Sequence, residues 1–312
     1  MKTKKTNVML CPQTGTVFSK SASKYLLGSL AAVAALPLTA TSVRADDASS
    51  KADALVNFEF SDHYLTPRGM IVQNKGLVFQ QLVLGFFQIY KGDNAYFNSA
   101  TVVGGVWNCF GTGMLPSSES GGAKGTSWYE IDPIAGLSFG LMKHATLDVT
   151  YTDFNMQIFN IPFSQHLDTK LSLDDSPWLK AFALHPYVEF WDELDGKAVA
   201  SNNTGTPKSS FYFDLGVTPS YTFDKIGLKF ETPCRVLLPD SNFYGTVPDS
   251  SSVGLYEVGI KATIPLKFMP TGYGHWSFHA GFKYMGFESD NLKATQHSSG
   301  STAVYCGLTS FF

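Results

Sequence analysis

Residues 211–223 read FYFDLGVTPSYTF, and this stretch decides the fold. Every second residue, from Phe211 through Leu215 to Phe223, is mostly large and apolar, while the residues between them, such as Asp214 and Gly216, are mostly polar or small. Successive side chains of a β-strand point to opposite faces, so the pattern predicts a strand with one apolar and one polar face. The run exceeds the ~5–6 residues common in soluble sheets. Its length is instead typical of a strand that crosses a membrane.

The same alternation recurs along the chain. Residues 225–238 repeat it after a tight turn at Asp224 and Lys225, and residues 253–268 repeat it again. Eleven segments show the pattern directly, and one more strand between residues 158 and 178 restores an even count with alternating short and long connections. The expected strands lie near 54–65, 77–90, 96–109, 127–142, 145–158, 163–174, 178–190, 209–223, 225–238, 253–268, 275–288 and 302–312.

After the N-terminal segment, the sequence has no uninterrupted apolar run of the length needed for a helical membrane span. Strands can span lipid only when they close on themselves, because an open edge would leave backbone groups unsatisfied. The sequence therefore predicts an all-β fold, a transmembrane antiparallel up-and-down β-barrel of about 12 strands. Outer loops are expected near 66–76, 110–126, 158–163, 191–208, 239–252 and 289–301.

The N-terminal segment has the pattern of a signal peptide. Residues 1–45 hold six basic residues and no acidic one, and an apolar run over 25–38 precedes the small residues Val43 and Ala45. This pattern is typical of a secretory signal with its cleavage site. We therefore expect 1–45 to be removed, 46–53 to form a short periplasmic lead, and 54–312 to form one outer-membrane barrel domain of a Gram-negative bacterium.

Composition excludes one class of function. Without its first 45 residues the chain keeps 17 Lys and Arg against 26 Asp and Glu, a net charge of −9. A protein with this charge repels phosphate, so nucleic acid is excluded as a partner. Only 16% of the whole chain is charged and 14% is aromatic, which suits a barrel whose outer wall faces lipid.

Cysteine and histidine give no metal site. Cys109, Cys234 and Cys306 lie far apart, and no Cys or His spacing typical of zinc is present. His275 and His279 are four residues apart in an expected strand, which does not suit paired ligation. No metal and no cofactor are therefore expected.

The chain ends in a strand that finishes on Phe312. A last strand closing on a C-terminal Phe resembles the signal that the assembly machinery of outer-membrane barrels reads. We therefore expect Phe312 to be a C-terminal assembly signal, and the assembly machinery to be a partner together with the lipid bilayer and lipopolysaccharide.

Two stretches resemble a family of porin-like barrels sometimes called Gcw_chp. Residues 60–69, FSDHYLTPRG, resemble the start of that family, and residues 128–139, WYEIDPIAGLSF, lead into Leu147–Tyr151 as in its members. The inserted Leu65, Thr66 and Pro67 depart from the usual spacing. The resemblance implies a barrel with at most a transport role and brings no catalytic residue.

Charged residues collect on the face that alternation turns toward the lumen. The expected set is Glu59, Glu130, Asp132, Asp148, Asp168, Lys170, Glu189, Asp214, Lys229, Glu231, Arg235, Glu257, Lys261, Lys267 and Lys283. The acids come mainly from earlier strands and the bases from later ones, so one wall is expected to be acidic and the facing wall basic. Charged rings usually mark a solute pathway.

The favoured function is a narrow channel that passes small polar solutes or ions by passive diffusion. A barrel of ~8 strands is filled by side chains and one of ~16 leaves a wide pore, so twelve strands lie between these cases. The alternative is a plugged structural or surface-interaction barrel whose lumen charges pair with one another. A monomer in the bacterial outer membrane is expected.

An enzyme is a remote alternative. Outer-membrane lipases use a His-x-Ser pair, and His297 and Ser299 have that spacing. The pair falls in an expected polar loop and has no identifiable partner to orient the imidazole. We therefore expect no enzymatic activity.

Overall fold

The computed structural model describes residues 52–93, 96–112, 127–157, 164–180, 182–195, 209–241, 243–245 and 249–312. The expected signal peptide over 1–45 and most of the expected lead over 46–53 lie outside these residues. The first strand begins at Ala52, two residues before the expected start of the barrel.

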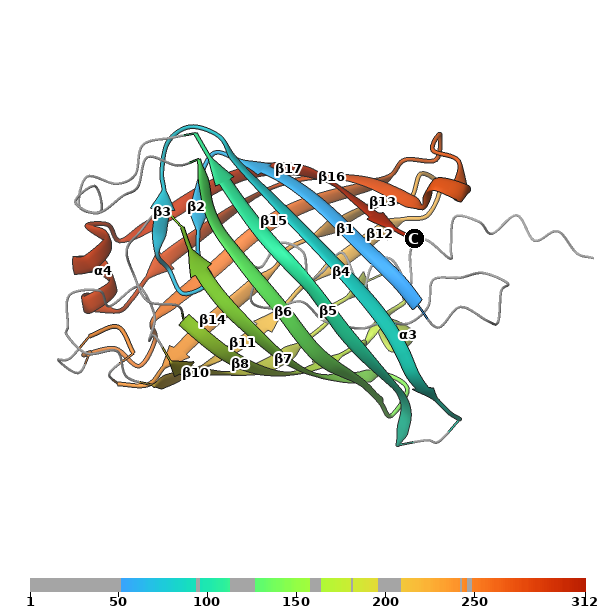
Figure 1. Ribbon diagram of the computed structural model, residues 1–312, viewed down its shortest axis with the longest axis horizontal. Helices are drawn as coiled ribbons and strands as arrows, with labels where there is room; N and C mark the ends of the chain where they lie inside the picture. Colours follow the sequence, from blue (N-terminus) through green and yellow to red (C-terminus); the bar gives the residue numbers. More distant parts are fainter. Residues whose placement is uncertain are drawn as a thin grey trace, which may run out of the picture.

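A closed antiparallel barrel forms the whole described chain (Figure 1). Its segments, in order, are β1 (Ala52–Ser61), β4 (Val78–Lys91), β5 (Phe97–Gly111), β6 (Trp128–Leu141), β7 (Ala145–Met156), β8 (Ser164–Leu173), β9 (Phe182–Ala183), β10 (Tyr187–Asp195), β11 (Ser210–Val217), β12 (Ser220–Phe223), β13 (Leu228–Glu231), β14 (Cys234–Pro239), β15 (Leu255–Pro265), β16 (His275–Phe287) and β17 (Gly300–Phe311). β1 pairs with β17 from Leu55 opposite Phe311 to Ser61 opposite Tyr305, which closes the ring. Three wall strands are each interrupted once, as β9 and β10, β11 and β12, and β13 and β14, so the predicted count of twelve is confirmed.

Proline causes the three interruptions. Pro186, Pro219 and Pro233 lie in the gaps of the three broken strands. Proline has no backbone N–H and cannot continue a central ladder. The carbonyls of Pro219 and Pro233 still accept hydrogen bonds, from Thr232 N at 2.8 Å and Gly259 N at 2.8 Å. Neighbouring strands therefore bend together while the wall remains continuous.

One expected strand was placed wrongly. The segment expected over 178–190 runs instead over 182–195, as β9 and β10. The helix α3 (Ser176–Leu179) takes up the start of the expected strand, with Pro177 in its first turn, where a proline is tolerated. The alternation of Trp191, Glu193 and Asp195 extends the strand into the expected outer loop over 191–208.

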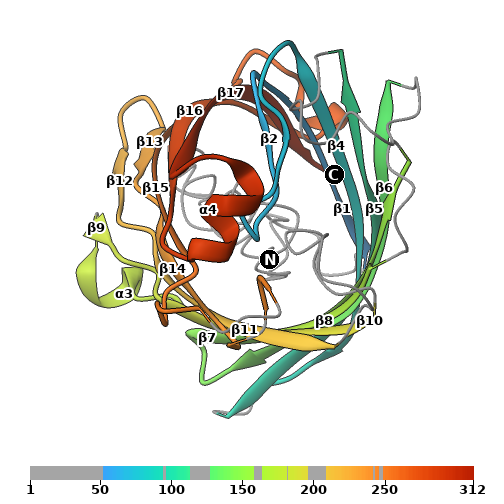
Figure 2. The ribbon, with the colours of Figure 1, turned by 90° about the vertical axis from the view of Figure 1, so that its left-hand side faces the viewer.

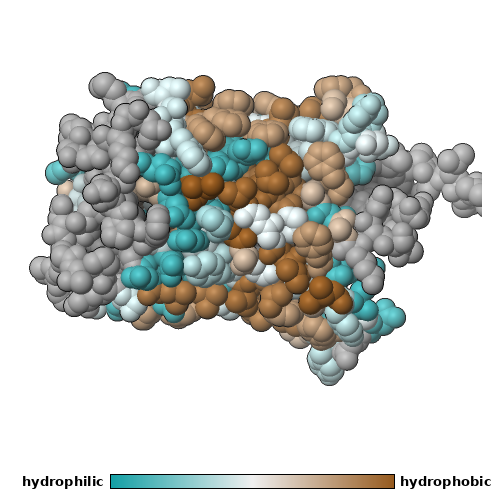
Figure 3. Space-filling view, viewed as in Figure 1, coloured by the Kyte–Doolittle hydropathy of each residue, from teal (hydrophilic) through white to brown (hydrophobic). Residues whose placement is uncertain are grey.

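The outer face of the barrel is an apolar belt (Figure 3). Phe213, Leu215 and Ile260 are exposed on this face, while their neighbours in sequence Asp214 and Lys261 are buried. A closed barrel with an apolar outer band is the form in which strands span a bacterial outer membrane. The protein is therefore a bacterial outer-membrane barrel. None of the helices in the described ranges is long and apolar enough to cross a membrane.

The two ends of the barrel differ. Short connections join strands at the end that holds the C-terminus, including the turn with the 3-10 helix η2 (Thr271–Tyr273). The long connections lie at the opposite end, which is the extracellular end in barrels of this kind. There Ser289 caps the N-terminus of α4 (Asp290–Gln296), because its hydroxyl accepts a hydrogen bond from the backbone N–H of Leu292. Figure 2 looks at this end and shows α4 and β2 lying across the ring of strands.

The connection between β1 and β4 folds into the barrel. It contains a two-stranded hairpin of β2 (Tyr64–Leu65) and β3 (Ile71–Gln73), and residues 64–73 are all buried. We name residues 62–77 the lumen hairpin. The expectation that 66–76 form an outer loop was therefore wrong. Met70, Ile71 and Val72 explain the difference, because three consecutive apolar side chains are stabilised by burial rather than by water.

Candidate functional site

A row of charged side chains crosses the inner wall. Asp148 lies directly opposite Lys170, Lys170 opposite Glu189, and Glu189 opposite Asp214. Directly opposed residues of neighbouring strands lie on the same face, so all four point into the lumen. Arg235 on β14 and Glu257 on β15 continue the sequence of charges. We name these six residues the charge row: Asp148, Lys170, Glu189, Asp214, Arg235 and Glu257.

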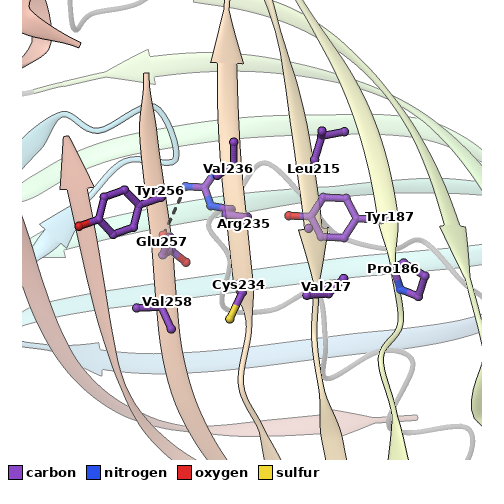
Figure 4. Close-up of a pocket in the computed structure, with 11 residues that line it drawn as sticks. Pro186, Tyr187, Leu215, Val217, Cys234, Arg235, Val236, Tyr256, Glu257 and Val258 are labelled. Atoms are coloured by element: carbon purple, nitrogen blue, oxygen red, sulfur yellow. Dashed lines mark hydrogen bonds and ion pairs between the residues drawn. The ribbon is translucent and has the colours of Figure 1, made fainter. Parts of the chain in front are cut away.

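Two cations hold the row together. The ammonium of Lys170 lies 3.5 Å from Glu189 Oε2 and 3.8 Å from the ring centre of Tyr187. The guanidinium of Arg235 donates to Asp214 and lies 3.3 Å from Glu257 Oε2, as the dashed line in Figure 4 shows. Charge-assisted bonds of this kind are about twice as strong as neutral ones. The two ion-paired groups meet at Tyr187, whose hydroxyl donates to Asp214 at 3.1 Å while its ring faces the Lys170 ammonium.

Carboxylates outnumber cations in this row. Glu189 is 1% exposed, and neither of its carboxylate oxygens has a hydrogen-bond partner. Its direct neighbour across the ladder is a second carboxylate, Asp214. Like charges directly opposite each other are destabilising, and a buried charge is costly unless it is compensated. The middle of the row is therefore a place where positive charge is favoured.

A second charged group lies on the later strands. Glu231 Oε1 accepts from Lys229 Nζ at 2.6 Å, and Lys261 Nζ lies 3.4 Å from Glu231 Oε2. His279 Nε2 lies 3.6 Å from Glu59 Oε2 across the closing strands. The later bases thus share carboxylates on the same part of the wall. The expected basic wall was therefore wrong, although the acids Glu130, Asp132 and Asp148 do lie on β6 and β7, which hold no Lys or Arg.

The tip of the lumen hairpin reaches this polar lining through Arg68. Its Nη1 donates to Glu193 Oε1 at 3.0 Å and lies 2.9 Å from His166 Nε2, and its guanidinium sits 4.6 Å above the centre of the Phe154 ring. Burial alone would lower the pKa of Arg68, but the Glu193 carboxylate raises the pKa above its ordinary value. The hairpin tip therefore carries a permanent positive charge.

The other side of the hairpin contacts β5 and β6. The hydroxyl of Tyr64 donates to Glu130, and its ring lies 5.6 Å from that of Trp107. Tyr64 and Val72 share an apolar cluster with Cys109 on β5. This end of the hairpin is therefore anchored by packing and by one buried hydrogen bond.

The hairpin crosses the full lumen. Pro67 O accepts from Arg235 Nη2 at 2.7 Å, on β14, and Arg68 O accepts from the hydroxyl of Tyr244 at 2.9 Å. Burial raises the pKa of that Tyr244 phenol, so it remains a donor. In the ring order of the twelve wall strands, β5 and the strand containing β14 are opposite each other. The hairpin therefore spans the lumen between two facing walls.

The hairpin turn requires a glycine. Gly69 has a φ of +95°, and a Cβ there would lie 2.7 Å from Leu292 of α4. Only glycine adopts this backbone conformation without strain. On the returning strand, Ile71 N donates to Gln296 Oε1 of α4 at 2.7 Å. The helix at the extracellular end thus holds the hairpin in place.

A cavity of about 580 Å³ borders the charge row at the wall (Figure 4). Its lining combines apolar residues that alternate toward the outer face with polar residues of the inner face. Gly216 is needed here, because a Cβ would lie 2.3 Å from the Tyr187 ring that covers it. The lining residues are Pro186, Tyr187, Leu215, Gly216, Val217, Cys234, Arg235, Val236, Tyr256, Glu257 and Val258. The side chains of the wall therefore leave this space unfilled beside Arg235.

The structure brings most of the expected lumen residues together. Every member of the expected set except Lys267 and Lys283 is buried. Lys283 is half-buried on β16. Lys267 is exposed in the turn after β15, which ends at Pro265, so its expected place in the lumen was wrong.

Sequence reasoning missed four contributors: Tyr64, Arg68, His166 as a contact of the hairpin, and Glu193. Arg68 and Glu193 belong to segments that were expected to be loops, and Tyr64 was expected near the end of a wall strand. The period-two pattern through Glu189, Trp191 and Glu193 could have shown that this strand continues to Glu193, with these three side chains facing the lumen.

The remaining candidates form no second site. Among the residues that the structure describes, no group of three or more His, Cys, Asp or Glu side chains could hold a metal ion. His297 is the residue that ends α4, in the left-handed conformation with a φ of 50°. Phe312, the expected assembly signal, follows β17 and its ring lies 6.3 Å from that of Trp276.

Among known proteins, the chain is similar to solved structures of outer-membrane barrels, and the similarity is one of fold alone. No family model matches the chain, and no curated protein matches it. The resemblance to the Gcw_chp family therefore stays a prediction.

Three solved structures illustrate these similarities. The COG4313 outer membrane channel from Pseudomonas putida F1 has 9% identity and a TM-score of 0.47, covering 86% of this chain and 100% of that one. The translocator domain of the autotransporter NalP from Neisseria meningitidis has 11% identity and a TM-score of 0.43, covering 86% and 90%. The transport unit of the autotransporter AIDA-I from Escherichia coli has 14% identity and a TM-score of 0.42, covering 94% and 96%. Because all three TM-scores are below 0.5, the fold assignment rests on the strand pairing of this chain.

Proposed function

We propose that this outer-membrane barrel is a channel that passes small polar solutes or ions by passive diffusion, through a lumen narrowed by the lumen hairpin. The observation that carries the proposal is the charge row, which runs from β7 to β15 through directly opposed residues and through the diagonal ion pair of Asp214 with Arg235. A polar, charged lining is typical of a pathway through a membrane. A buried charge lowers stability unless it is paired and hydrogen-bonded. The carboxylate of Glu189 has no hydrogen bond to either oxygen, so its charge is not fully compensated.

The width of the passage is set by two features. The width of a twelve-stranded lumen is intermediate: a barrel of ~8 strands is filled by side chains, and one of ~16 strands has a wide aqueous pore. The lumen hairpin then occupies part of this space, between Tyr64 on one side and Arg68 on the other. We therefore expect passage of ions and small solutes and exclusion of larger ones. The protein would work as a monomer without a cofactor and without enzymatic activity.

One observation favours the alternative of a plugged barrel. The hairpin is buried over residues 64–73 and is held from opposite walls. If it fills the lumen completely, the charges serve stability and the protein acts through its outer loops. Conductance separates the two functions, because a plugged barrel passes no ions.

The test is single-channel recording of the purified protein in a planar lipid bilayer. We expect discrete steps that are smaller than those of a sixteen-stranded porin under the same salt, because both the ring and the hairpin narrow the path. Heat-modifiable mobility on a gel serves as the control that the barrel is folded. Silence from folded protein would contradict the channel and favour the plugged barrel.

A further inference from the structure

The lumen of the described chain holds an excess of acidic charge. The buried charged residues on the wall strands and the lumen hairpin comprise ten carboxylates and five cations. The imbalance is greatest on one side of the ring. The segments β1, β5, β6 and β7 contain no Lys or Arg, whereas Glu130, Asp132 and Asp148 lie on β6 and β7.

The cations are already engaged. Arg68 pairs with Glu193, Lys170 with Glu189, and Arg235 with both Asp214 and Glu257. Of the other lysines on the inner face, Lys229 and Lys261 share Glu231, and Lys283, half-buried on β16, adds one more cation, so carboxylates still outnumber cations. An ion pair cancels most of the field that its cation would exert on a passing solute. The field along the lumen is therefore set by the carboxylates that remain in excess.

Glu189 lies next to this acidic side of the ring, in a group of four carboxylates with Asp148, Asp168 and Asp214 that surrounds Lys170. It lies directly opposite Asp214, and Asp168 lies on the neighbouring strand opposite Trp191, one inward-facing position along from Glu189. Both oxygens of the Glu189 carboxylate lack a hydrogen-bond partner. The ammonium of Lys170 rests between this carboxylate and the face of the Tyr187 ring. A carboxylate beside an aromatic face is an arrangement that favours a cation.

We infer that the channel is selective for cations, including ammonium-bearing solutes, and that Glu189 is one of the carboxylates that determine this selectivity. The inference rests on the proposed function, because selectivity has a meaning only if ions pass. The charge excess would lower the energy of a cation in the middle of the lumen and raise that of an anion.

The test is the reversal potential of the purified protein in a planar bilayer with a KCl gradient. We expect the wild-type protein to pass K⁺ in preference to Cl⁻. Glu189→Gln should lower the ratio of K⁺ to Cl⁻ permeability by roughly sixteenfold, because one unit charge about 5 Å away in a water-like dielectric acts roughly fourfold on each ion and in opposite directions. Asp192→Asn is the matched control. It removes the same charge from β10, at a position that alternates to the outer face, so the ratio should not change.

The outcomes separate the two proposals. A wild-type channel that conducts but prefers Cl⁻ would overturn the cation selectivity and leave the channel standing. Equal ratios for Glu189→Gln and Asp192→Asn would overturn the role of Glu189. Silence from folded wild-type protein would overturn both. If Glu189→Gln fails to fold, Asp168→Asn removes a neighbouring carboxylate of the same lining and should lower the ratio in the same direction.

Discussion

Replacing residues 63–76 with a short Gly-Ser linker is expected to raise the single-channel conductance by a factor of about three or more, because the freed cross-section is then set by the twelve-stranded ring alone. The hairpin bridges β5 and β6 on one side and β14 on the other, through Tyr64 and Pro67. Its removal takes away side chains and backbone from the middle of the path. The measurement is conductance in a planar bilayer at one salt concentration.

The control for this change is a deletion of similar length in the connection over 113–126, which lies outside the described residues. That variant should keep the wild-type conductance, since the hairpin is intact. An unchanged conductance after removal of residues 63–76 would show that the hairpin does not narrow the path. Heat-modifiable mobility again confirms that each variant is folded.

Arg68→Met is expected to lower the free energy of unfolding by about 3–5 kcal/mol, the usual cost of removing one partner of a buried ion pair. Arg68 and Glu193 are 3% and 0% exposed, so the remaining carboxylate would be left in a buried site. Methionine keeps much of the side-chain volume, so the loss reports mainly the charge. The free energy is measured by urea unfolding of the barrel in a lipid or detergent environment that supports reversible folding.

Two further variants make this result specific. Lys75→Met removes an exposed base from the same hairpin and should change the free energy of unfolding by no more than about 0.5 kcal/mol. Adding Glu193→Gln to Arg68→Met removes the uncompensated charge and should recover a large part of the loss. A loss for Arg68→Met no larger than that for Lys75→Met would contradict the role of Arg68 as the anchor of the hairpin tip.

The wall of the barrel could be predicted from the sequence because its signal is local. In a membrane-spanning strand, lipid and lumen select every second residue, so the pattern from Phe211 to Phe223 is readable without knowledge of any partner. The inward direction of Glu189, Asp214 and Lys261 follows from the same period. Lys267 shows the limit of the method, because alternation alone does not reveal that β15 ends at Pro265.

The lumen hairpin could not be predicted in the same way. Its contacts join residues far apart in sequence: Arg68 with Glu193, 125 positions away, and Arg235 with Pro67, 168 positions away. A segment rich in turn residues between two strands is typical of an exposed loop. Two local features alone indicated that this segment is buried in the lumen: the apolar run from Met70 to Val72 and the single arginine before Gly69. The ion pair of Lys229 with Glu231 is local, because the two residues share one face of β13, whereas that of Lys261 with Glu231 depends on β13 pairing with β15.

The position of the lumen hairpin decides how much of the lumen is filled, and Cys109 reports that position directly. This free cysteine lies on β5, is 0% exposed, and shares a cluster with Tyr64 and Val72 of the hairpin. The measurement is the rate at which Cys109 reacts with a small charged thiol reagent in water, in a Cys234→Ser, Cys306→Ser background. Slow labelling of the intact protein and fast labelling after removal of residues 63–76 are the predicted result. Equally fast labelling of both proteins would contradict a hairpin inside the lumen.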